Sequence, residues 1–234
     1  MFLYDNFLNG RVPIGSKLLD RSSLLDSRLI LALDFPQANV KDILEGLKGL
    51  VVGVKVGFPL ALELGWEGIE QLISKFPDYY WIADFKLADI PDIVSHILKR
   101  FERIGFDSAI IHLFTGHRTY DVSLELIGVA GMSHPEAWLV RENFMKLLES
   151  ASLLRIQGIV VGATRPEMIR EARRKLPTIR IFSPGIGFQG ARPGSALQAG
   201  ANYEIVGRSI LRSDDPIKAA EEIVRAQRGV LHGC

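Results

Sequence analysis

The stretch YYWIADFKLAD, residues 79–89, joins an apolar run to a row of charges. Its aromatic first half is typical of a buried strand. Residues two apart on a strand point to the same side, so we expect Asp84 and Lys86 to project together, with Asp89 just beyond. Buried charge is costly unless it is paired, and active sites of parallel α/β proteins lie at strand ends. The stretch therefore predicts a catalytic row of charges; the alternative is a strand that ends in water.

Length and composition limit the classes of protein. The 234 residues are 47% hydrophobic and 24% charged, which suits one large α/β domain with a substantial core. The net charge of +1 gives no indication of nucleic-acid binding. The single cysteine, Cys234, excludes an intrachain disulfide framework. There is no apolar run of membrane-spanning length and no basic start of a secretory signal, so we expect a soluble cytoplasmic protein without a membrane partner.

Strand-like and helix-like segments alternate along the chain. The strand-like runs are at 28–34, 51–57, 79–84, 107–113, 123–130, 157–162, 178–183 and 202–206. Helical patterns lie at 37–48, 60–75, 90–104, 136–153, 165–175, 191–199 and 215–228. Eight strands alternating with helices predict an α/β fold, a closed (β/α)8 TIM barrel; the alternative is a doubly wound open sheet.

Two regions depart from this regular repeat. Residues 1–27 form an N-terminal extension, in which residues 22–27 are expected to form a short helix, and residues 28–234 form the barrel domain. Only the segment from about His117 to Val122 separates the fourth and fifth strand runs, so we expect a shortened fourth crossover.

Two helix starts are marked by local sequence. Asp214-Asp215-Pro216 places acids and a proline where a helix N-terminus favours them. Thr164-Arg165-Pro166-Glu167 has the pattern of a capping box.

Charges lie at further expected strand ends. Asp34 ends the first strand run, and Lys55 interrupts the apolar run VVGVKVG, residues 51–57. A lysine in such a strand needs a partner, which the nearby carboxylates would supply. The alternative for Lys55 is a side chain that extends to the barrel rim.

Two glycine-containing segments predict a phosphate site. SPGIGFQG, residues 183–190, follows the seventh strand run, and VGRS, residues 206–209, follows the eighth. Loops after strands 7 and 8 are the usual phosphate site of these barrels, and Arg208 adds a planar cation. The first segment also matches a dinucleotide fingerprint, but that motif belongs to a first βα unit. The alternative is an ordinary glycine-rich loop with a surface arginine.

The histidines do not predict a metal site. None of the five has the spacing of metal ligands, and His112, in an apolar strand run, is interpreted as a core histidine with its hydrogen bonds satisfied. Ser133 follows the fifth strand run and is therefore expected at the catalytic mouth.

These motifs together resemble the archaeal type of the orotidine 5′-phosphate decarboxylase family, in the family's order, from about residue 28 to the last helix. The matching segments are Leu31–Asp34, Val54–Gly57, Ala83–Pro91, Met132–Pro135, Thr164–Glu167, Pro184–Gly190 and Ile205–Ser209. The resemblance departs at Ile93, where the family commonly has a hydroxyl residue near the ribose.

The resemblance implies a (β/α)8 homodimer that converts orotidine 5′-phosphate to UMP and CO2 without a cofactor or metal. It implies that Lys86 protonates C6, that Asp84 lies against the departing carboxylate, and that Asp89 reaches the neighbouring subunit's site. The implied catalytic residues are Lys55, Asp84, Lys86 and Asp89. The implied substrate-binding residues are Asp34, Ile90, Ser133, Pro184, Gln189, Gly207 and Arg208, with the loop around 185–194 closing as a lid.

Two other functions remain open. Related phosphosugar enzymes, such as 3-keto-gulonate-6-phosphate decarboxylase or hexulose-phosphate synthase, share the Asp-x-Lys-x-x-Asp core but use magnesium. The Asp89-Ile90-Pro91 continuation and Ser133-His134-Pro135 favour the nucleotide enzyme. The second possibility is a catalytically silent barrel that binds a phosphorylated ligand, which an intact set of four charged residues argues against.

Overall fold

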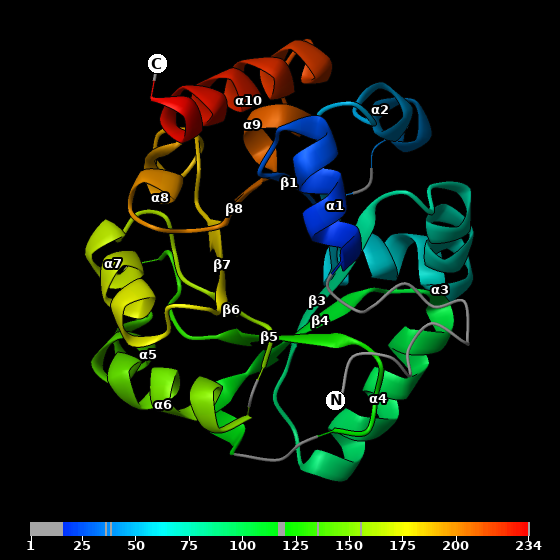
Figure 1. Ribbon diagram of the computed structural model, residues 1–234. Helices are drawn as coiled ribbons and strands as arrows, with labels where there is room; N and C mark the ends of the chain where they lie inside the picture. The colour runs from blue at the N-terminus through cyan, green and yellow to red at the C-terminus, as the bar shows by residue number, and fades with distance from the viewer. Residues whose placement is uncertain are drawn as a thin grey trace, which may run out of the picture.

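The structure, a computed structural model, describes residues 16–35, 37, 39–116, 120–134, 136–154 and 156–233. Eight parallel strands close into a barrel in sequential order, and helices surround it (Figure 1). The predicted (β/α)8 barrel is therefore confirmed, and the open sheet is excluded. The strands are β1 (Leu29–Leu33), β2 (Gly53–Gly57), β3 (Tyr80–Leu87), β4 (Ser108–His112), β5 (Glu125–Val129), β6 (Gly158–Val160), β7 (Arg180–Pro184) and β8 (Tyr203–Val206).

The helices follow the predicted order with differences at their ends. They are α1 (Ser16–Leu25), α2 (Val40–Gly46), α3 (Phe58–Lys75), α4 (Pro91–Ile104), the 3-10 turn η1 (Leu113–Thr115), α5 (Trp138–Glu142), α6 (Phe144–Leu154), α7 (Pro166–Lys175), α8 (Ser195–Gln198), α9 (Arg208–Leu211) and α10 (Pro216–His232). None of these described helices is long and apolar enough to cross a membrane.

The strands bury both of their faces, which explains their nearly continuous apolar sequence. One face packs against the outer helices, as Leu31 and Trp81 do. The other face fills the barrel interior, where Ile30, Ile82 and Ile110 pack together. Side chains along a strand alternate between these two faces. The last inward-facing side chain of a strand therefore lies at the carboxyl end of the barrel, where the charged residues are.

The fourth crossover is short, as predicted. It runs over residues 113–124, with η1 as its one helical turn in the part that the structure describes, and residues 117–119 lie outside the described residues. β4 and β5 are shorter than the predicted runs, which leaves about the dozen residues that a parallel connection needs. α6 packs beside η1, since the Ser150 hydroxyl donates to the Leu113 carbonyl at 3.1 Å.

One of the two predicted helix starts is correct. Asp215 caps α10 by accepting hydrogen bonds from the backbone N–H groups of Ile217 and Lys218 at 3.1 and 3.0 Å. The capping box at Thr164 is wrong, because the N-cap of α7 is Arg165 and makes no side-chain cap bond. The Thr164 hydroxyl instead donates to the Ser133 carbonyl at 3.0 Å, which fastens the loop after β6 to the loop after β5.

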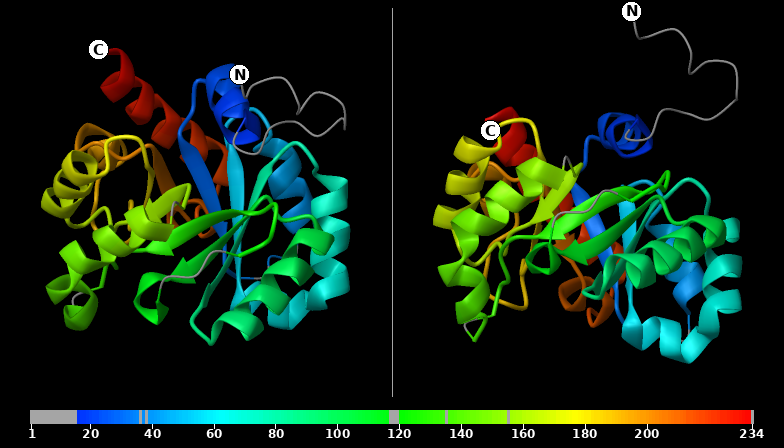
Figure 2. Two further views of the ribbon diagram at one scale, coloured as in Figure 1. Left: turned by 60° about the horizontal axis from the view of Figure 1, so that its bottom comes forward. Right: turned by 90° about the horizontal axis from the view of Figure 1, so that it is seen from below.

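α1 begins earlier and is longer than the short helix expected at residues 22–27. It lies at the end of the barrel where the strands begin (Figure 2). Leu18 enters the interior apolar cluster, Lys17 forms an ion pair with Asp107 at 2.8 Å, and Arg21 donates to the Val51 carbonyl. The inward face of α1 mixes Leu18 with Arg21 and Ser22, which hides its helical periodicity in the sequence. α1 therefore closes the N-terminal end of the barrel.

We predict that Leu18→Ala lowers the free energy of unfolding by about 2–5 kcal/mol, because it leaves a cavity at the base of the barrel. The matched control is Leu24→Ala on the same helix, since Leu24 is 81% exposed whereas Leu18 is fully buried. The control is expected to change stability by less than about 0.5 kcal/mol. Urea unfolding of both variants measures the two changes in stability. Equal losses of stability would contradict the conclusion that α1 closes the N-terminal end of the barrel.

Candidate active site

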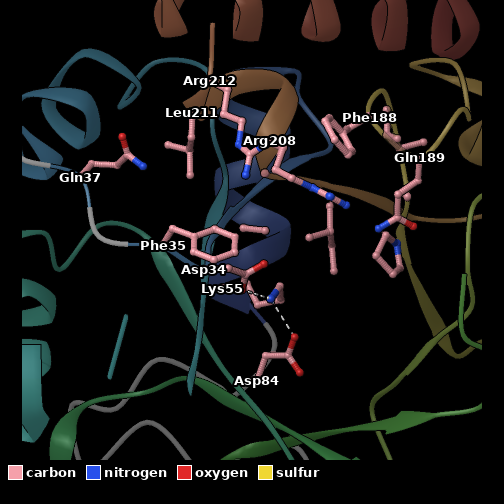
Figure 3. A pocket seen from close by; sticks show the side chains of 16 residues that line it. Asp34, Phe35, Gln37, Lys55, Asp84, Phe188, Gln189, Arg208, Leu211 and Arg212 are labelled. Atoms are coloured by element: carbon pink, nitrogen blue, oxygen red, sulfur yellow. Dashed lines mark hydrogen bonds and ion pairs between the residues drawn. The ribbon is translucent and has the colours of Figure 1, made fainter. Parts of the chain in front are cut away.

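A cavity of about 400 Å³ lies at the carboxyl ends of the strands (Figure 3). Three parts of the chain form its walls. They are the ends of β1, β2 and β3, the loop after β7, and the segment that runs from β8 through α9 to the C-cap residue of α9. The lining residues are Ala32, Asp34, Phe35, Gln37, Lys55, Asp84, Pro184, Gly185, Ile186, Phe188, Gln189, Ile205, Gly207, Arg208, Leu211 and Arg212. Seven of the sequence-predicted site residues therefore line one cavity: Asp34, Lys55, Asp84, Pro184, Gln189, Gly207 and Arg208.

A row of alternating charges occupies one end of this cavity. Lys55 Nζ lies 2.6 Å from Asp34 Oδ1 and 2.7 Å from Asp84 Oδ2, and Lys86 Nζ lies 2.8 Å from Asp84 Oδ1. The strand register sets this order, because Lys55 of β2 lies between β1 and β3. The side chains of Lys55 and Asp84 are only 8% and 7% exposed, whereas that of Lys86 is 40% exposed. Lys86 is therefore the more exposed ammonium group of the row, whereas Lys55 is the one that lines the cavity.

The pairing keeps the buried members of the row charged. Burial by itself lowers the pKa of Lys55, but the charges of Asp84 and Asp34 outweigh it and raise that pKa above its ordinary value. Burial likewise opposes ionisation of Asp84, yet Lys55 and Lys86 hold the pKa of its carboxyl below the ordinary value. Each charge thus depends on its neighbours for its state at neutral pH.

The backbone of β3 changes conformation at Lys86. Its φ of 44° lies in the left-handed region, which is uncommon for a residue with a side chain, and the register with β4 shifts between Ala83 and Leu87. We expected regular strand alternation to bring Lys86 beside Asp84; a bulge with a strained lysine does so instead. Such strain persists only where the surroundings impose it, and it is common at functional sites.

The opposite end of the cavity is built from the two glycine-containing segments. Gly207 is the N-cap of α9, and a Cβ there would lie 3.0 Å from the Ala32 carbonyl oxygen, so a larger residue would crowd β1. Gly187 has a φ of 72°, and a Cβ there would overlap Ser209 Oγ. That hydroxyl accepts a hydrogen bond of 2.8 Å from the Phe188 N–H. The loop after β7 is thereby fixed to the first turn of α9.

Four predicted residues lie outside the cavity lining. One is Lys86, which is next to it through the ion pair with Asp84. Ser133 is just behind it, since its Cβ is 3.4 Å from where a Cβ on Gly185 would be. Asp89 and Ile90 are exposed where the chain enters α4, and Ile90 is 64% exposed. Asp89 Oδ1 accepts a hydrogen bond from the Ile90 N–H at 2.6 Å. The described chain alone therefore does not bring Asp89 into the row of charges.

His112 differs from the prediction of a satisfied core histidine. Its buried Nδ1 has no hydrogen-bond partner among the described residues, and its ring lies 4.6 Å from that of Phe114, centroid to centroid. Burial, and then the charge of Lys86, lower the pKa of the imidazole below its ordinary value. The prediction failed because an apolar strand run does not reveal that its last residue faces the charged end of the barrel.

Sequence reasoning missed several lining residues: Phe35, Gln37, Phe188, Leu211 and Arg212. Arg212 follows Arg208 by four residues, the spacing of one helix face, but the short helix α9 was not expected and this signal went unused. Phe188 lay within the glycine-rich segment but was not chosen as a site residue. In the part of the chain that the structure describes, no cluster of three or more His, Cys, Asp or Glu side chains could hold a metal ion.

Comparisons with known proteins agree with this architecture. The model of the "Orotidine 5'-phosphate decarboxylase / HUMPS family" matches residues 27–223. The chain belongs to this family. It is 38% identical over 206 residues to orotidine 5′-phosphate decarboxylase of Thermococcus kodakarensis, an alignment that covers 85% of this chain and 95% of the relative.

Solved structures give the same relationship. The crystal structure of orotidine 5′-monophosphate decarboxylase from Metallosphaera sedula is 41% identical, with a TM-score of 0.77 over 87% of this chain and 99% of that one. The enzyme from Methanocaldococcus jannaschii complexed with the inhibitor BMP is 32% identical, with a TM-score of 0.76 over 86% and 98% of the two chains.

The lowered pKa of Asp84 predicts a specific loss of stability in acid. Its ion pairs stabilise the fold above the unfolded pKa of about 3.9, and this contribution is lost as pH falls through the lower folded pKa. Asp84→Asn resembles the protonated, uncharged side chain. We therefore expect the wild type to be more stable than Asp84→Asn near neutral pH, with the difference shrinking below about pH 4. Urea unfolding across this range tests it, and a difference independent of pH would contradict it.

Proposed function

We propose that this protein is an orotidine 5′-phosphate decarboxylase, which converts orotidine 5′-phosphate to UMP and CO2 in pyrimidine biosynthesis. The observation that carries the proposal is the Lys55–Asp84–Lys86 row at one end of a cavity whose other end holds Arg208 and the loop after β7. Family membership and relatives that bear this enzyme's name support it. The cavity can thus hold a reacting ring at one end and a phosphate at the other.

The chemistry requires strong electrostatic stabilisation. Breaking the bond between C6 and the carboxylate releases CO2 and leaves the electron pair on C6, where no π system spreads it. A positioned ammonium stabilises that charge in a site that excludes water. Lys86 is the accessible ammonium group of the row, so it stabilises the developing carbanion and then gives C6 its proton. Solvent afterwards returns a proton to Lys86.

The remaining charges take supporting roles. Asp84, held between two ammonium groups, fixes Lys86 and lies against the departing carboxylate. Lys55 and Asp34 form hydrogen bonds with the ribose hydroxyls. Ser133, which lies behind Gly185, forms hydrogen bonds with the edge of the pyrimidine ring. Lys55 and Lys86 both contact Asp84, and these two contacts keep Asp84 ionised. A substitution of Lys55 therefore also affects Lys86, through Asp84.

The same row favours a mechanism without a metal ion over that of the magnesium-dependent phosphosugar enzymes. Both oxygens of Asp84 lie within 2.8 Å of an ammonium nitrogen, and Asp34 Oδ1 contacts Lys55. Carboxylates paired in this way already have their positive partner, whereas a magnesium site needs oxygen ligands that remain available. The proposed reaction accordingly uses no metal and no organic cofactor.

The phosphate end uses both loops. Arg208 supplies a guanidinium fork, and Gly207 lines the same end of the cavity, with Gln189 and Pro184 on the loop side. The loop at 185–194 closes over the ligand, so that binding of the remote phosphate contributes to catalysis at C6.

The proposed active form is a cytoplasmic homodimer. Asp89 and Ile90 are exposed and do not line the chain's own cavity, and exposed apolar side chains follow strands β3 and β4, Ile93 in α4 and Phe114 in η1. A second copy would cover this apolar surface and receive Asp89 and Ile90 in its own site. Asp89 would then extend the row of charges beyond Lys86.

We predict that Lys86→Ala abolishes nearly all turnover of orotidine 5′-phosphate while UMP still binds, because the ammonium group acts on the reacting carbon. The loss of substrate absorbance and calorimetric binding of UMP measure the two properties. Lys218→Ala, on the exposed face of α10, is the matched control and is expected to keep wild-type turnover. A Lys86→Ala protein that retains most of its activity would refute the proposed function.

The sharing of sites between subunits predicts complementation. Lys86→Ala and Asp89→Asn homodimers are each expected to be inactive. In a mixed dimer, one site combines the intact Lys86 of one subunit with the intact Asp89 of the other, so equal mixing after subunit exchange should restore about a quarter of wild-type activity. No recovery in dimers shown to have exchanged subunits would place Asp89 in its own subunit's site or outside catalysis.

A further inference from the structure

Two arginines face the phosphate end of the cavity from one side of α9. Arg208 begins the helix, and Arg212 is its C-cap residue, four positions later. Both line the cavity, and Figure 3 shows them beside Phe188 at the end away from Asp84 and Lys55. The proposed function uses Arg208 but gives no role to Arg212 or Phe188.

The pair of arginines is electrostatically unfavourable without an anion. Like charges four residues apart repel one another, and among the described residues neither guanidinium forms an ion pair with a carboxylate. Some arginines elsewhere in the fold have such partners; Arg180, for example, lies 2.6 Å from Glu125. Two unpaired cations that share one cavity wall are the arrangement expected where a ligand brings more than one negative charge.

Phe188 contacts both cations. The guanidinium carbon of Arg208 lies 3.8 Å from the ring centroid, and that of Arg212 lies 5.6 Å from it. The ring is 58% exposed, but its backbone is anchored through the Phe188 N–H to Ser209. The negative face of an aromatic ring attracts cations, so Phe188 partly offsets the repulsion and keeps both side chains at the cavity.

We propose that Arg212 is a second guanidinium ligand of the substrate phosphate, and that Phe188 holds Arg208 and Arg212 at the cavity before the ligand binds. The inference rests on the proposed function and deepens it. A phosphomonoester carries about −1.5 to −2 charges near neutral pH, which two guanidinium groups match better than one. The geometry thereby selects dianionic phosphomonoesters over ligands with a single charge.

The test compares a substrate with and without its phosphate. In Arg212→Gln we expect kcat/KM for orotidine 5′-phosphate to fall between about 10- and 100-fold, as for a lost hydrogen bond to a charged group. The kcat/KM for orotidine, which lacks the phosphate, should stay within about twofold of wild type, since Arg212 would not touch it. Phe188→Leu, which keeps apolar bulk but removes the ring, should show the same selectivity with a smaller loss.

Matched variants separate ligand binding from folding. Arg225→Gln, on the exposed surface of α10, removes the same charge away from the cavity and should leave both substrates unaffected. Arg208→Gln should show the selective loss of the phosphorylated substrate. Wild-type kcat/KM for orotidine 5′-phosphate in Arg212→Gln would overturn the inference, and so would an equal loss on both substrates.

A binding measurement distinguishes this inference from the proposed function. Calorimetry with UMP and uridine requires no turnover, so it reports on Arg212 even if the wild type fails to consume orotidine 5′-phosphate. Arg212→Gln should weaken UMP binding and leave uridine binding unchanged. Unchanged UMP binding in this variant would overturn the role of Arg212 whatever reaction the protein catalyses, whereas an inactive wild type would count against the proposed function alone.

Discussion

The buried carboxylate of Asp84, held between the ammonium groups of Lys55 and Lys86, is the interaction on which the site depends. A buried charge without partners would be strongly destabilising, and Asp84 has two partners, since each of its oxygens contacts one lysine. The pair also fixes local geometry, since β1, β2 and β3 must keep their register for Lys55 to reach both Asp34 and Asp84. The strained backbone at Lys86 is tolerated within this framework and places the Lys86 ammonium group against Asp84.

The two ends of the barrel differ in how they are closed. At the base, α1 inserts Leu18 into the interior cluster, and the Glu125 carboxylate bonds Tyr80 and Arg180. At the opposite end the loop after β7 is held to α9 through Ser209 and the contacts of Phe188 with two arginines, although the Phe188 ring is 58% exposed. The packed base keeps the charged strand ends in place, and the loop closure proposed above would leave them undisturbed.

The sequence predicted the elements whose signal is local. Continuous apolar runs marked all eight strands, and charges at their ends identified Asp34, Lys55 and Asp84. Three features lacked such a signal. α1 mixes Arg21 and Ser22 into its buried face; α9 is too short for periodicity to reveal that Arg208 and Arg212 share a side; and a lysine gives no indication of a left-handed backbone. These features depend on contacts between distant segments, which one sequence does not display.

In the proposed mechanism, paired side-chain charges carry the decarboxylation without a metal ion. The most direct measurement is the loss of orotidine 5′-phosphate absorbance on mixing with the purified protein in excess EDTA, with UMP identified as the product. We expect full activity under these conditions, equal to that with added magnesium. Activity that appears only when magnesium is restored, or only with phosphosugar substrates, would contradict the account and place the chain with the metal-dependent members of its family.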